Sequence, residues 1–284
     1  MEHIPGVLTF IPPRGAARPF VLEAPRSGRE YPNDFRVAAS FNDVHSSVSQ
    51  YVEELYRDAP DAGASLLWAL FPNSYIDANR HLDDIDPDLL NEPWPTPLSP
   101  SEKSVQLGTG LIHKVAKPGV ALYDRKLSVE EVKHRIDRYY RPYHGKVAAI
   151  IDDNVKAFDR SWHWSCHRMA PVGQPHARDA GRPRKDFCIS DGGGKTSDKV
   201  FLDATVSAFQ SEGFTTSVND PYLGAAAIRL HGKPDANRHS LQIEMNKALY
   251  MDEQTLGKGP RFEEIRARLA KVVQRIARSC EETL

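Results

Sequence analysis

The sequence predicts an α/β fold in which a mixed, mostly parallel sheet is flanked by helices. Short apolar segments typical of buried strands alternate along the chain with segments whose apolar residues recur at helical spacing. Neither an internal repeat nor a long low-complexity linker divides the 284 residues, so we expect one domain, residues 1–284. A hydrophobic content of 40% and a charged content of 26% are typical of a globular protein.

The first part of the chain contains a strand, a helix and a second apolar segment. Residues 20–24 are predicted to form a buried strand that ends in a turn at residues 25–28, where proline and glycine occur together. Apolar residues at helical spacing predict a helix over residues 47–57, and an apolar segment follows at residues 64–71. Residues 91–100 carry four prolines, which exclude regular helix and central strand, so we expect a loop there.

A capping box marks the start of the longest helix predicted in the second part of the chain. Ser128 is followed three residues later by Glu131, the pattern in which each residue caps the other's backbone. Apolar residues continue at helical spacing to Ile151, and Pro142 should kink this helix or divide it in two. The elements expected after it are a basic surface loop at 173–185, a helix at 198–210 and a last amphipathic helix from about residue 260.

Charge and composition exclude several classes of partner. The formal net charge of -1 creates no overall field toward nucleic acid or an anionic membrane, so we expect neither as a partner. No apolar run is long enough to cross a bilayer, and the first residues do not resemble a signal peptide. The three cysteines are too few and too scattered for a disulfide framework, which predicts a reducing, cytoplasmic location. These features leave the oligomeric state open.

A late segment of the chain contains a carboxylate suited to acid–base chemistry. Leu241 and Ile243 are typical of the inward face of a short strand, so Gln242 and Glu244 should point to the opposite face, toward a region rich in His, Arg and Asn. An acid held at the end of a strand beside a polar cleft is a candidate general base. A solvated glutamate on an edge strand would show the same alternation, so alternation alone leaves both interpretations open.

Short motifs occur in a characteristic order along nearly the whole chain. They are Pro25-Arg26-Ser27-Gly28, Gly63-Ala64, Tyr75 to Arg80, Gly108 to Gly110, Tyr123 to Leu127, Arg141-Pro142-Tyr143-His144, Cys166-His167, Asn219-Asp220-Pro221-Tyr222, Gln242-Ile243-Glu244 and Tyr250-Met251-Asp252-Glu253. Their order and spacing resemble the N-formylglutamate amidohydrolase family. The resemblance implies a zinc-carboxypeptidase-like single domain that hydrolyses the amide of N-formyl-glutamate or related N-acyl amino acids. The expected partner is therefore a small carboxylate-bearing substrate.

The resemblance also implies a zinc site, which needs two histidines, a carboxylate, an open position for water and a glutamate that accepts the proton of that water. In the family the first histidine lies in a Pro-His-Ser-Gly turn, where this chain has Arg26, which cannot ligate zinc because it keeps its charge. The family's acidic ligand lies where this chain has Val48 and Ser49. Only the ligand His167 and the proton acceptor Glu244 are retained, so zinc is expected from the family although most of its ligand positions are replaced.

Two alternatives account for the replaced ligands. A relocated zinc site could use His45, His163 and Cys166, although strand alternation sends His163 and Cys166 to opposite faces. Alternatively, Arg26 points to the position of the metal, where its guanidinium could bind a carboxylate or polarise a carbonyl oxygen. A structural ion pair between Arg26 and Glu244 in an inactive site explains the same substitution.

The substrate side of the family pattern is better preserved than the metal side. The resemblance assigns Asn79 and Arg80 to the carboxylate of the amino acid, for which a bidentate arginine is physically suited. The other residues that it places around the substrate are Tyr143, His144, Asn219 and Arg229. The structural alternatives are a satisfied core histidine at His144 and, for Arg80, a salt bridge to one of its acidic neighbours Asp83, Asp84 and Asp86.

Together these features predict an amidohydrolase of small N-formyl or N-acyl amino acids. Glu244 is the predicted general base, His167 a metal ligand or an acid–base group, and Arg26 a third candidate catalytic residue. The alternatives are a metal-free family member with altered chemistry and a catalytically inactive protein that binds a small carboxylate.

Overall fold

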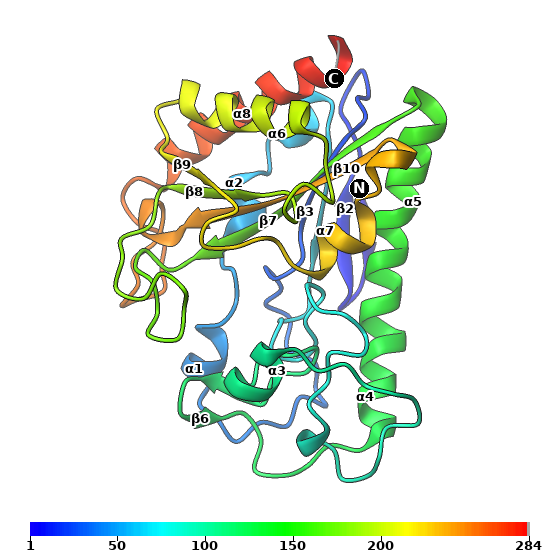
Figure 1. Ribbon diagram of the computed structural model, residues 1–284, viewed down its shortest axis with the longest axis vertical. Helices are drawn as coiled ribbons and strands as arrows, with labels where there is room; N and C mark the ends of the chain where they lie inside the picture. Colours follow the sequence, from blue (N-terminus) through cyan, green and yellow to red (C-terminus); the bar gives the residue numbers. More distant parts are fainter. Residues whose placement is uncertain (283–284) are drawn as a thin grey trace.

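A mixed eight-stranded sheet forms the centre of the computed structural model, which describes residues 1–282 (Figure 1). The strands lie in the order β1-β2-β4-β3-β7-β10-β8-β9. Their bounds are β1 Glu2–Ile4, β2 Leu8–Ile11, β3 Phe20–Ala24, β4 Ser65–Ala69, β7 Ser161–Met169, β8 Phe187–Ser190, β9 Thr216–Val218 and β10 Arg238–Asn246, with β5 Val115–Lys117 and β6 Val120–Ala121 in a separate ribbon. The central strands β4, β3, β7 and β10 are parallel to one another. The predicted mixed, mostly parallel sheet is confirmed.

Helices cover both faces of this sheet. Their bounds are α1 Phe41–His45, α2 Val52–Leu55, α3 Glu102–Leu107, α4 Val129–Arg135, α5 Arg141–Phe158, α6 Lys199–Ser211, α7 Ala226–His231 and α8 Phe262–Glu282. Short helical turns are η1 Ala59–Ala62, η2 Pro87–Leu89, η3 Ile136–Tyr140, η4 Pro234–Ala236 and η5 Lys247–Leu249. Helices α2, α6 and α8 pack on one face and α5 with α7 on the other (Figure 1). Among residues 1–282, no helix combines the length and apolarity that a membrane span requires.

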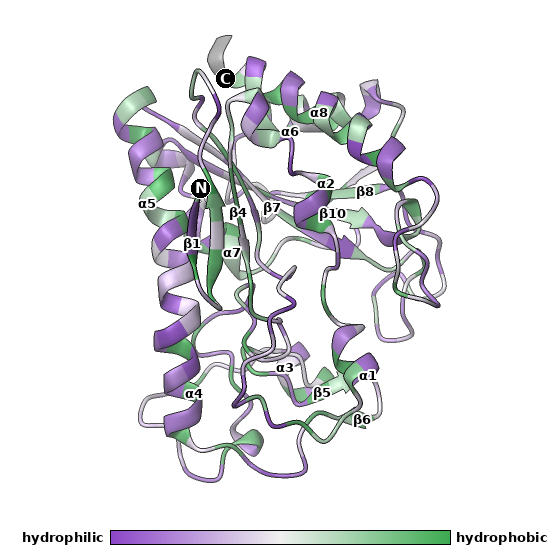
Figure 2. Ribbon diagram, turned by 180° about the vertical axis from the view of Figure 1, so that it is seen from behind, coloured by the Kyte–Doolittle hydropathy of each residue, from purple (hydrophilic) through white to green (hydrophobic). Residues whose placement is uncertain are grey.

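The two faces of the central strands differ in chemistry. Leu241 and Ile243 of β10 lie in the apolar core beneath α6 and α8, as predicted from alternation. Gln242 and Glu244 point to the opposite face, where they are buried beside polar residues of the neighbouring strand β7. In Figure 2, α5 and α8 alternate between hydrophilic and hydrophobic residues along their length, as expected for helices with one face on a core. The polar face of β7 and β10 is therefore available to form a site.

The predicted helix over residues 47–57 is wrong in extent. Only one turn, α2, is helical within it, and Tyr51 just before α2 has a positive φ of 66°. The side chains of Ser46 and Ser47 donate hydrogen bonds to the carbonyl oxygens of Asp43 and Val44. Such local bonds compete with helix continuation, although the apolar residues here keep helical spacing.

The predicted long helix is present, and it changes geometry before Pro142. The capping box of Ser128 and Glu131 is confirmed at the start of α4. A π-helical segment, η3, then joins α4 to α5, and Pro142 lies in the first turn of α5. Because proline lacks an N–H donor and crowds the preceding turn, a local change of helical geometry is the expected accommodation. The helices predicted near 198–210 and from about 260 are also confirmed, as α6 and α8.

Gly28 lies in the turn after β3, and a substitution there tests how tightly this turn is packed. A Cβ at this position would lie 2.0 Å from the carbonyl oxygen of Phe71, which is backbone and has no freedom to rotate away. We expect Gly28→Ala to lower the free energy of unfolding by about 1–3 kcal/mol, measured by urea denaturation. The matched control is Gly145→Ala in α5, where a Cβ meets nothing within 4 Å, and it should stabilise by about 0.5–1 kcal/mol. Equal effects of the two substitutions would contradict this packing argument.

Candidate active site

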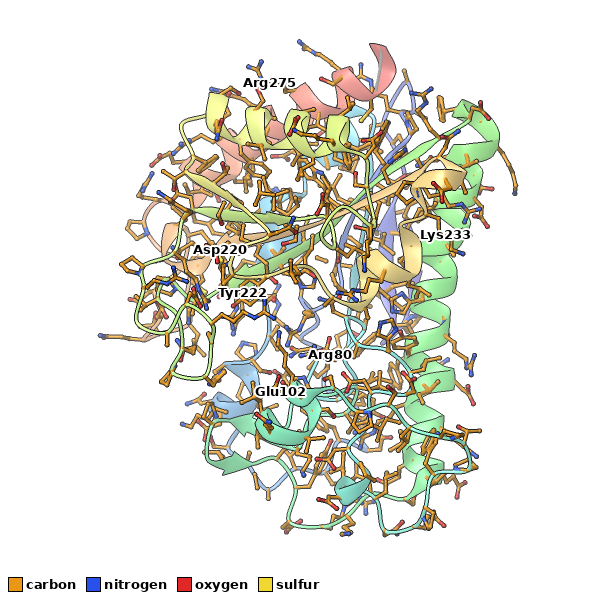
Figure 3. The ribbon with its side chains drawn as sticks, in the orientation of Figure 1. Arg80, Glu102, Asp220, Tyr222, Lys233 and Arg275 are labelled. Carbon is orange, nitrogen blue, oxygen red and sulfur yellow. The ribbon has the colours of Figure 1, made fainter. Side chains whose placement is uncertain are left out.

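Four parallel strands bring their carboxyl ends to one edge of the sheet, and the candidate site lies there. Arg26 follows β3, and Asp77 and Arg80 follow β4. His167 and Glu244 lie opposite each other near the ends of β7 and β10. Figure 3 shows Arg80 between the sheet and α3. The carboxyl edge of a parallel sheet is where ligands usually bind in α/β proteins.

Glu244 is a buried carboxylate with a raised pKa. Its side chain accepts a hydrogen bond of 2.9 Å from Nε2 of Gln242. Burial raises the pKa of Glu244 to about 7, because removing a carboxylate from water disfavours its charged form. The cations that oppose this rise are, in order of effect, Arg26, Lys103, Arg184 and Arg168. A carboxylate with a pKa near neutrality is suited to general base catalysis.

Asp77 holds two guanidinium groups of the site in place. Its side chain is 1% exposed, and its Oδ2 lies 3.4 Å from Nη2 of Arg26 and 3.9 Å from Nε of Arg80. Nε2 of His113 lies 3.3 Å from the same oxygen, and the backbone N–H of Asn79 donates to Oδ1 at 2.9 Å. Burial raises the pKa of Asp77, but Arg26, His113 and Arg80 outweigh that effect and hold the pKa well below its usual range. Asp77 is therefore ionised.

Arg80 is held by Asp77 and not by the acidic residues that follow it in sequence. Among the described residues Arg80 forms its ion pair with Asp77 and none with Asp83, Asp84 or Asp86, so the structural alternative is wrong. Asp84 instead accepts hydrogen bonds from Ser101, and Asp86 binds Lys114 at 2.6 Å. Within residues 1–282, Nε of Arg80 is buried and has no hydrogen-bond partner. Burial lowers the pKa of Arg80. The Arg80 side chain is 15% exposed, so part of it is accessible to an anionic ligand.

His167 is a neutral imidazole in this arrangement. Oδ1 of Asn79 accepts from the backbone N–H of Ala227, so Nδ2 of Asn79 is the atom that faces Nε2 of His167, at 3.2 Å. Because an amide nitrogen only donates, we assign Nε2 of His167 as the acceptor and place the proton on Nδ1. Burial, reinforced by the charge of Arg26, lowers the pKa of His167 to about 3.

Three basic or polar residues from distant segments complete the site, and the sequence did not predict them. Nζ of Lys103, on α3, lies 5.7 Å from the centre of the Tyr222 ring. Arg184 donates to the Tyr222 hydroxyl at 2.9 Å and forms a bidentate ion pair with Asp179. Figure 3 shows Tyr222 close to the level of Arg80, between the sheet and α3. Partial desolvation of the ammonium group, followed in effect by the charge of Arg80, lowers the pKa of Lys103. The site is thus rich in positive charge.

The signals for Asp77, Arg184 and Lys103 in the sequence were weak, and Tyr222 lay in a recognised motif without being assigned a role. Asp77 lies inside the motif Tyr75 to Arg80, where a buried acid between two recognised polar residues could have been singled out. Arg184 lies within the basic loop predicted at 173–185, and Lys103 follows a helix cap, but nothing in the local pattern connects either to Glu244.

Comparison with known proteins identifies the family. A model of the N-formylglutamate amidohydrolase family matches residues 18–251. This chain belongs to that family. N-formylglutamate deformylases of Pseudomonas putida and Pseudomonas aeruginosa are each 27% identical to it, over 72% of this chain and 70% and 71% of theirs. The crystal structure of N-formylglutamate amidohydrolase from Ralstonia eutropha JMP134 superposes with a TM-score of 0.92 at 37% identity, covering 98% of this chain and 100% of that one. A protein from Agrobacterium tumefaciens, 18% identical with a TM-score of 0.70 over 97% of this chain and 96% of its own, shares the fold.

The residues at the family's expected zinc-ligand positions do not fit a zinc ion. Arg26 forms its ion pair with Asp77, so the alternative of a structural pair with Glu244 is wrong. Val48 is fully buried in the core, and Ser49 is engaged through its backbone, whose N–H donates to the carbonyl oxygen of Arg26. Neither supplies the missing carboxylate. His167 is left as a single donor, and one imidazole cannot enforce tetrahedral coordination.

The relocated zinc site is wrong for the reason that strand alternation suggested. Cys166 lies in the apolar core under α6 and α8, whereas His163 lies on the polar face, where its Nδ1 contacts Oγ of Ser240. His45 is hydrogen-bonded to the Tyr31 hydroxyl at 2.8 Å. In the part of the chain that the structure describes, no group of three or more His, Cys, Asp or Glu side chains is placed to hold a metal ion.

The other four predicted substrate-binding residues have partners of their own or lie at the surface. The Tyr143 hydroxyl donates to Oε2 of Glu23 at 2.7 Å, and the side chain is fully buried. Nε2 of His144 donates to the carbonyl oxygen of Ala78 at 2.8 Å, as the satisfied core histidine of the structural alternative would. Nδ2 of Asn219 donates to Oδ1 of Asp191 at 2.8 Å, and Arg229 is exposed on α7. Their roles in binding stay predictions.

The raised pKa of Glu244 has a consequence for stability. Ionising Glu244 costs more in the folded than in the unfolded chain, so this cost is absent below pH 4.5 and complete above about pH 7. We expect Glu244→Gln to raise the free energy of unfolding at pH 8 by up to about 3 kcal/mol and to change it little at pH 4. Urea denaturation at both pH values measures the difference. Glu102→Gln on α3, which is exposed, serves as the control and should show no such pH dependence. A Glu244→Gln effect that is the same at both pH values would refute the assignment.

Proposed function

We propose that this chain hydrolyses the amide bond of small N-formyl or other N-acyl amino acids. Family membership supports this reaction class, and the two Pseudomonas relatives are named N-formylglutamate deformylases. The observation that carries the proposal is the Glu244 carboxylate, which is buried on the polar face of β10 opposite His167. This burial raises the pKa of Glu244 to about 7. A base of this pKa is partly ionised at neutral pH and can accept a proton from water.

In the proposed reaction Arg80 binds the substrate and Glu244 transfers the proton. Arg80 binds the carboxylate of the substrate through the exposed part of its guanidinium, while Asp77 holds the side chain in place. Glu244 accepts a proton from a water molecule as the water oxygen bonds to the carbonyl carbon. The C–N bond then breaks, and the protonated Glu244 delivers the proton to the departing amine. The products are the carboxylic acid, formic acid for an N-formyl substrate, and the free amino acid.

Loss of the base should abolish most of the activity. We expect Glu244→Gln to lower kcat/KM for N-formyl-L-glutamate by at least about 100-fold, because general base catalysis contributes factors of that order. In the unsubstituted protein, kcat/KM should rise with pH through about 7 as Glu244 ionises, and the variant should lack this rise. Formate release across pH 5–9 measures both. Glu102→Gln should retain the activity and the pH profile, and an unchanged profile in Glu244→Gln would rule out Glu244 as the base.

Substitution of Arg80 should weaken substrate binding more than it slows the chemical step. We expect Arg80→Gln to raise KM for N-formyl-L-glutamate by at least about tenfold, since a charge-assisted bidentate pair is removed. The variant should also lose its preference for the free acid over the corresponding amide of the same substrate. Arg275→Gln is the matched control, because Arg275 is exposed on α8 at the far end of the molecule (Figure 3). A similar KM in both variants would contradict the assignment of Arg80.

The replaced zinc ligands favour a second candidate function, a protein that binds small carboxylates without hydrolysing them. Its supporting observation is Arg26, which stands in the family's histidine position and lies in a strongly cationic site. Calorimetric titration with N-formyl-L-glutamate and L-glutamate, run beside the formate assay, separates the two functions. Binding without formate release supports the second function, and formate release supports the first.

A further inference from the structure

The backbone at Arg26 is fixed by contacts on both sides. Gly28 packs directly against the backbone of Leu70 and Phe71. Oγ of Ser27 donates to the carbonyl oxygen of Ser49 at 3.1 Å, and the N–H of Ser49 returns a 2.8 Å bond to the carbonyl oxygen of Arg26. The turn therefore holds the start of the Arg26 side chain in one place at the edge of the sheet.

The guanidinium of Arg26 is held by an ion pair, but not all of its hydrogen-bond donors have partners. Nη2 lies 3.4 Å from Asp77, which is itself fixed by His113 and by the backbone of Asn79. Nε of Arg26 is buried and has no hydrogen-bond partner among the described residues, and 26% of the side chain remains exposed. The exposed part of a guanidinium that is held in place in this way is suited to binding an oxygen atom of a ligand.

Arg26 and Glu244 lie at the same end of the sheet, and they form no ion pair with each other within the part of the chain that the structure describes, where the guanidinium is paired with Asp77. Arg26 follows β3, which pairs with β7, and Glu244 lies on β10, which pairs with β7 on its other side. Among the cations that lower the pKa of Glu244, Arg26 has the largest effect. A base and a cation at the carboxyl ends of the strands that flank β7 can hold a carbonyl group and its attacking water between them.

We propose that Arg26 takes the place of the family's metal ion: it donates hydrogen bonds to the carbonyl oxygen of the substrate amide, and this chain hydrolyses the amide without zinc. The inference rests on the proposed function, which it deepens. As water adds to the carbonyl carbon and its proton passes to Glu244, the carbonyl oxygen becomes an oxyanion that the guanidinium stabilises. When the C–N bond breaks, the carbonyl reforms and the proton of Glu244 leaves on the amine, so Arg26 neither gains nor loses a proton.

The chemistry of a guanidinium explains why the base must be strong. A zinc ion lowers the pKa of its bound water, but an arginine side chain has no vacant orbital and cannot do so. The whole activation of water then falls on Glu244, whose pKa burial raises to about 7. Asp77 shares the charge of Arg26, which limits how far Arg26 can lower that pKa.

The decisive experiment measures metal content and activity on the same sample. We expect the purified chain, after dialysis against dipicolinate, to hold less than about 0.1 zinc per chain and to release formate from N-formyl-L-glutamate at an unchanged rate. Calorimetric titration with Zn²⁺ should show no saturable one-to-one site, and added Zn²⁺ should not raise the melting temperature. One tightly bound zinc per chain whose removal stops hydrolysis would overturn the inference and leave the proposed function intact.

Substitution of Arg26 tests its part in the reaction. We expect Arg26→Gln to lower kcat of the dialysed protein by about 100- to 1000-fold with a smaller change in KM, the pattern for a group that stabilises the oxyanion. Arg26→Lys, which keeps a positive charge, should recover part of this loss, and Arg275→Gln should change kcat less than about twofold. Urea denaturation of each variant separates loss of catalysis from loss of folding. If Arg26→Gln leaves kcat unchanged, the inference is overturned and the proposed function stands. If the unsubstituted protein shows no hydrolysis with or without Zn²⁺, the proposed function is overturned as well.

Discussion

The buried carboxylate of Asp77 is the constraint on which the rest of the site depends. Two arginines and a histidine converge on it, and a buried guanidinium without a counter-charge would be strongly destabilising. The segment after β4 supplies the geometry, because the N–H of Asn79 closes a local turn on Asp77. The Asp77 carboxylate thereby fixes Arg26, from the turn after β3, relative to Arg80, from the segment after β4. Removing it would release both guanidiniums and leave their charge uncompensated near Glu244.

A second buried polar network supports the site from behind. His144 must donate to the carbonyl oxygen of Ala78, so its Nδ1 accepts, and His231 is then the donor in their 3.0 Å contact. Burial lowers the pKa of His231 to about 3, which keeps it neutral. The Tyr143 hydroxyl donates to Oε2 of Glu23 at 2.7 Å, and Nε2 of His163 lies 3.4 Å from Oε1 of the same carboxylate. These contacts anchor α5 to the segment after β4 that carries Asn79. Tyr143 and His144, which the resemblance assigns to the substrate, therefore act at least as supports of that segment.

Local patterns in the sequence predicted the features that depend on residues close in sequence, such as strand alternation and helix capping. The alternation of Leu241 to Glu244 placed Glu244 on the correct face, because a strand has a period of two. The capping box at Ser128 likewise depends on residues close in sequence. Lys103 and Arg184 escaped prediction because they reach Glu244 only through the packing of α3 and a long loop against the sheet edge. The helix expected over 47–57 failed where serine side chains compete for the backbone, an effect that apolar spacing does not reveal.

The balance of charge around Glu244 is compatible with the raised pKa of its carboxyl group. Four cations act on Glu244, and unopposed they would hold its pKa low and make it a weak base. Arg26 is partly neutralised by Asp77, Arg184 is paired with Asp179, and Arg168 donates to the carbonyl oxygens of Val48 and Ser46. Burial therefore remains the dominant influence on Glu244. A divalent metal at the position of Arg26 would bring twice the charge and would favour the ionised, less basic form of Glu244. An arginine at position 26 and the raised pKa of Glu244 are thus physically compatible parts of one site.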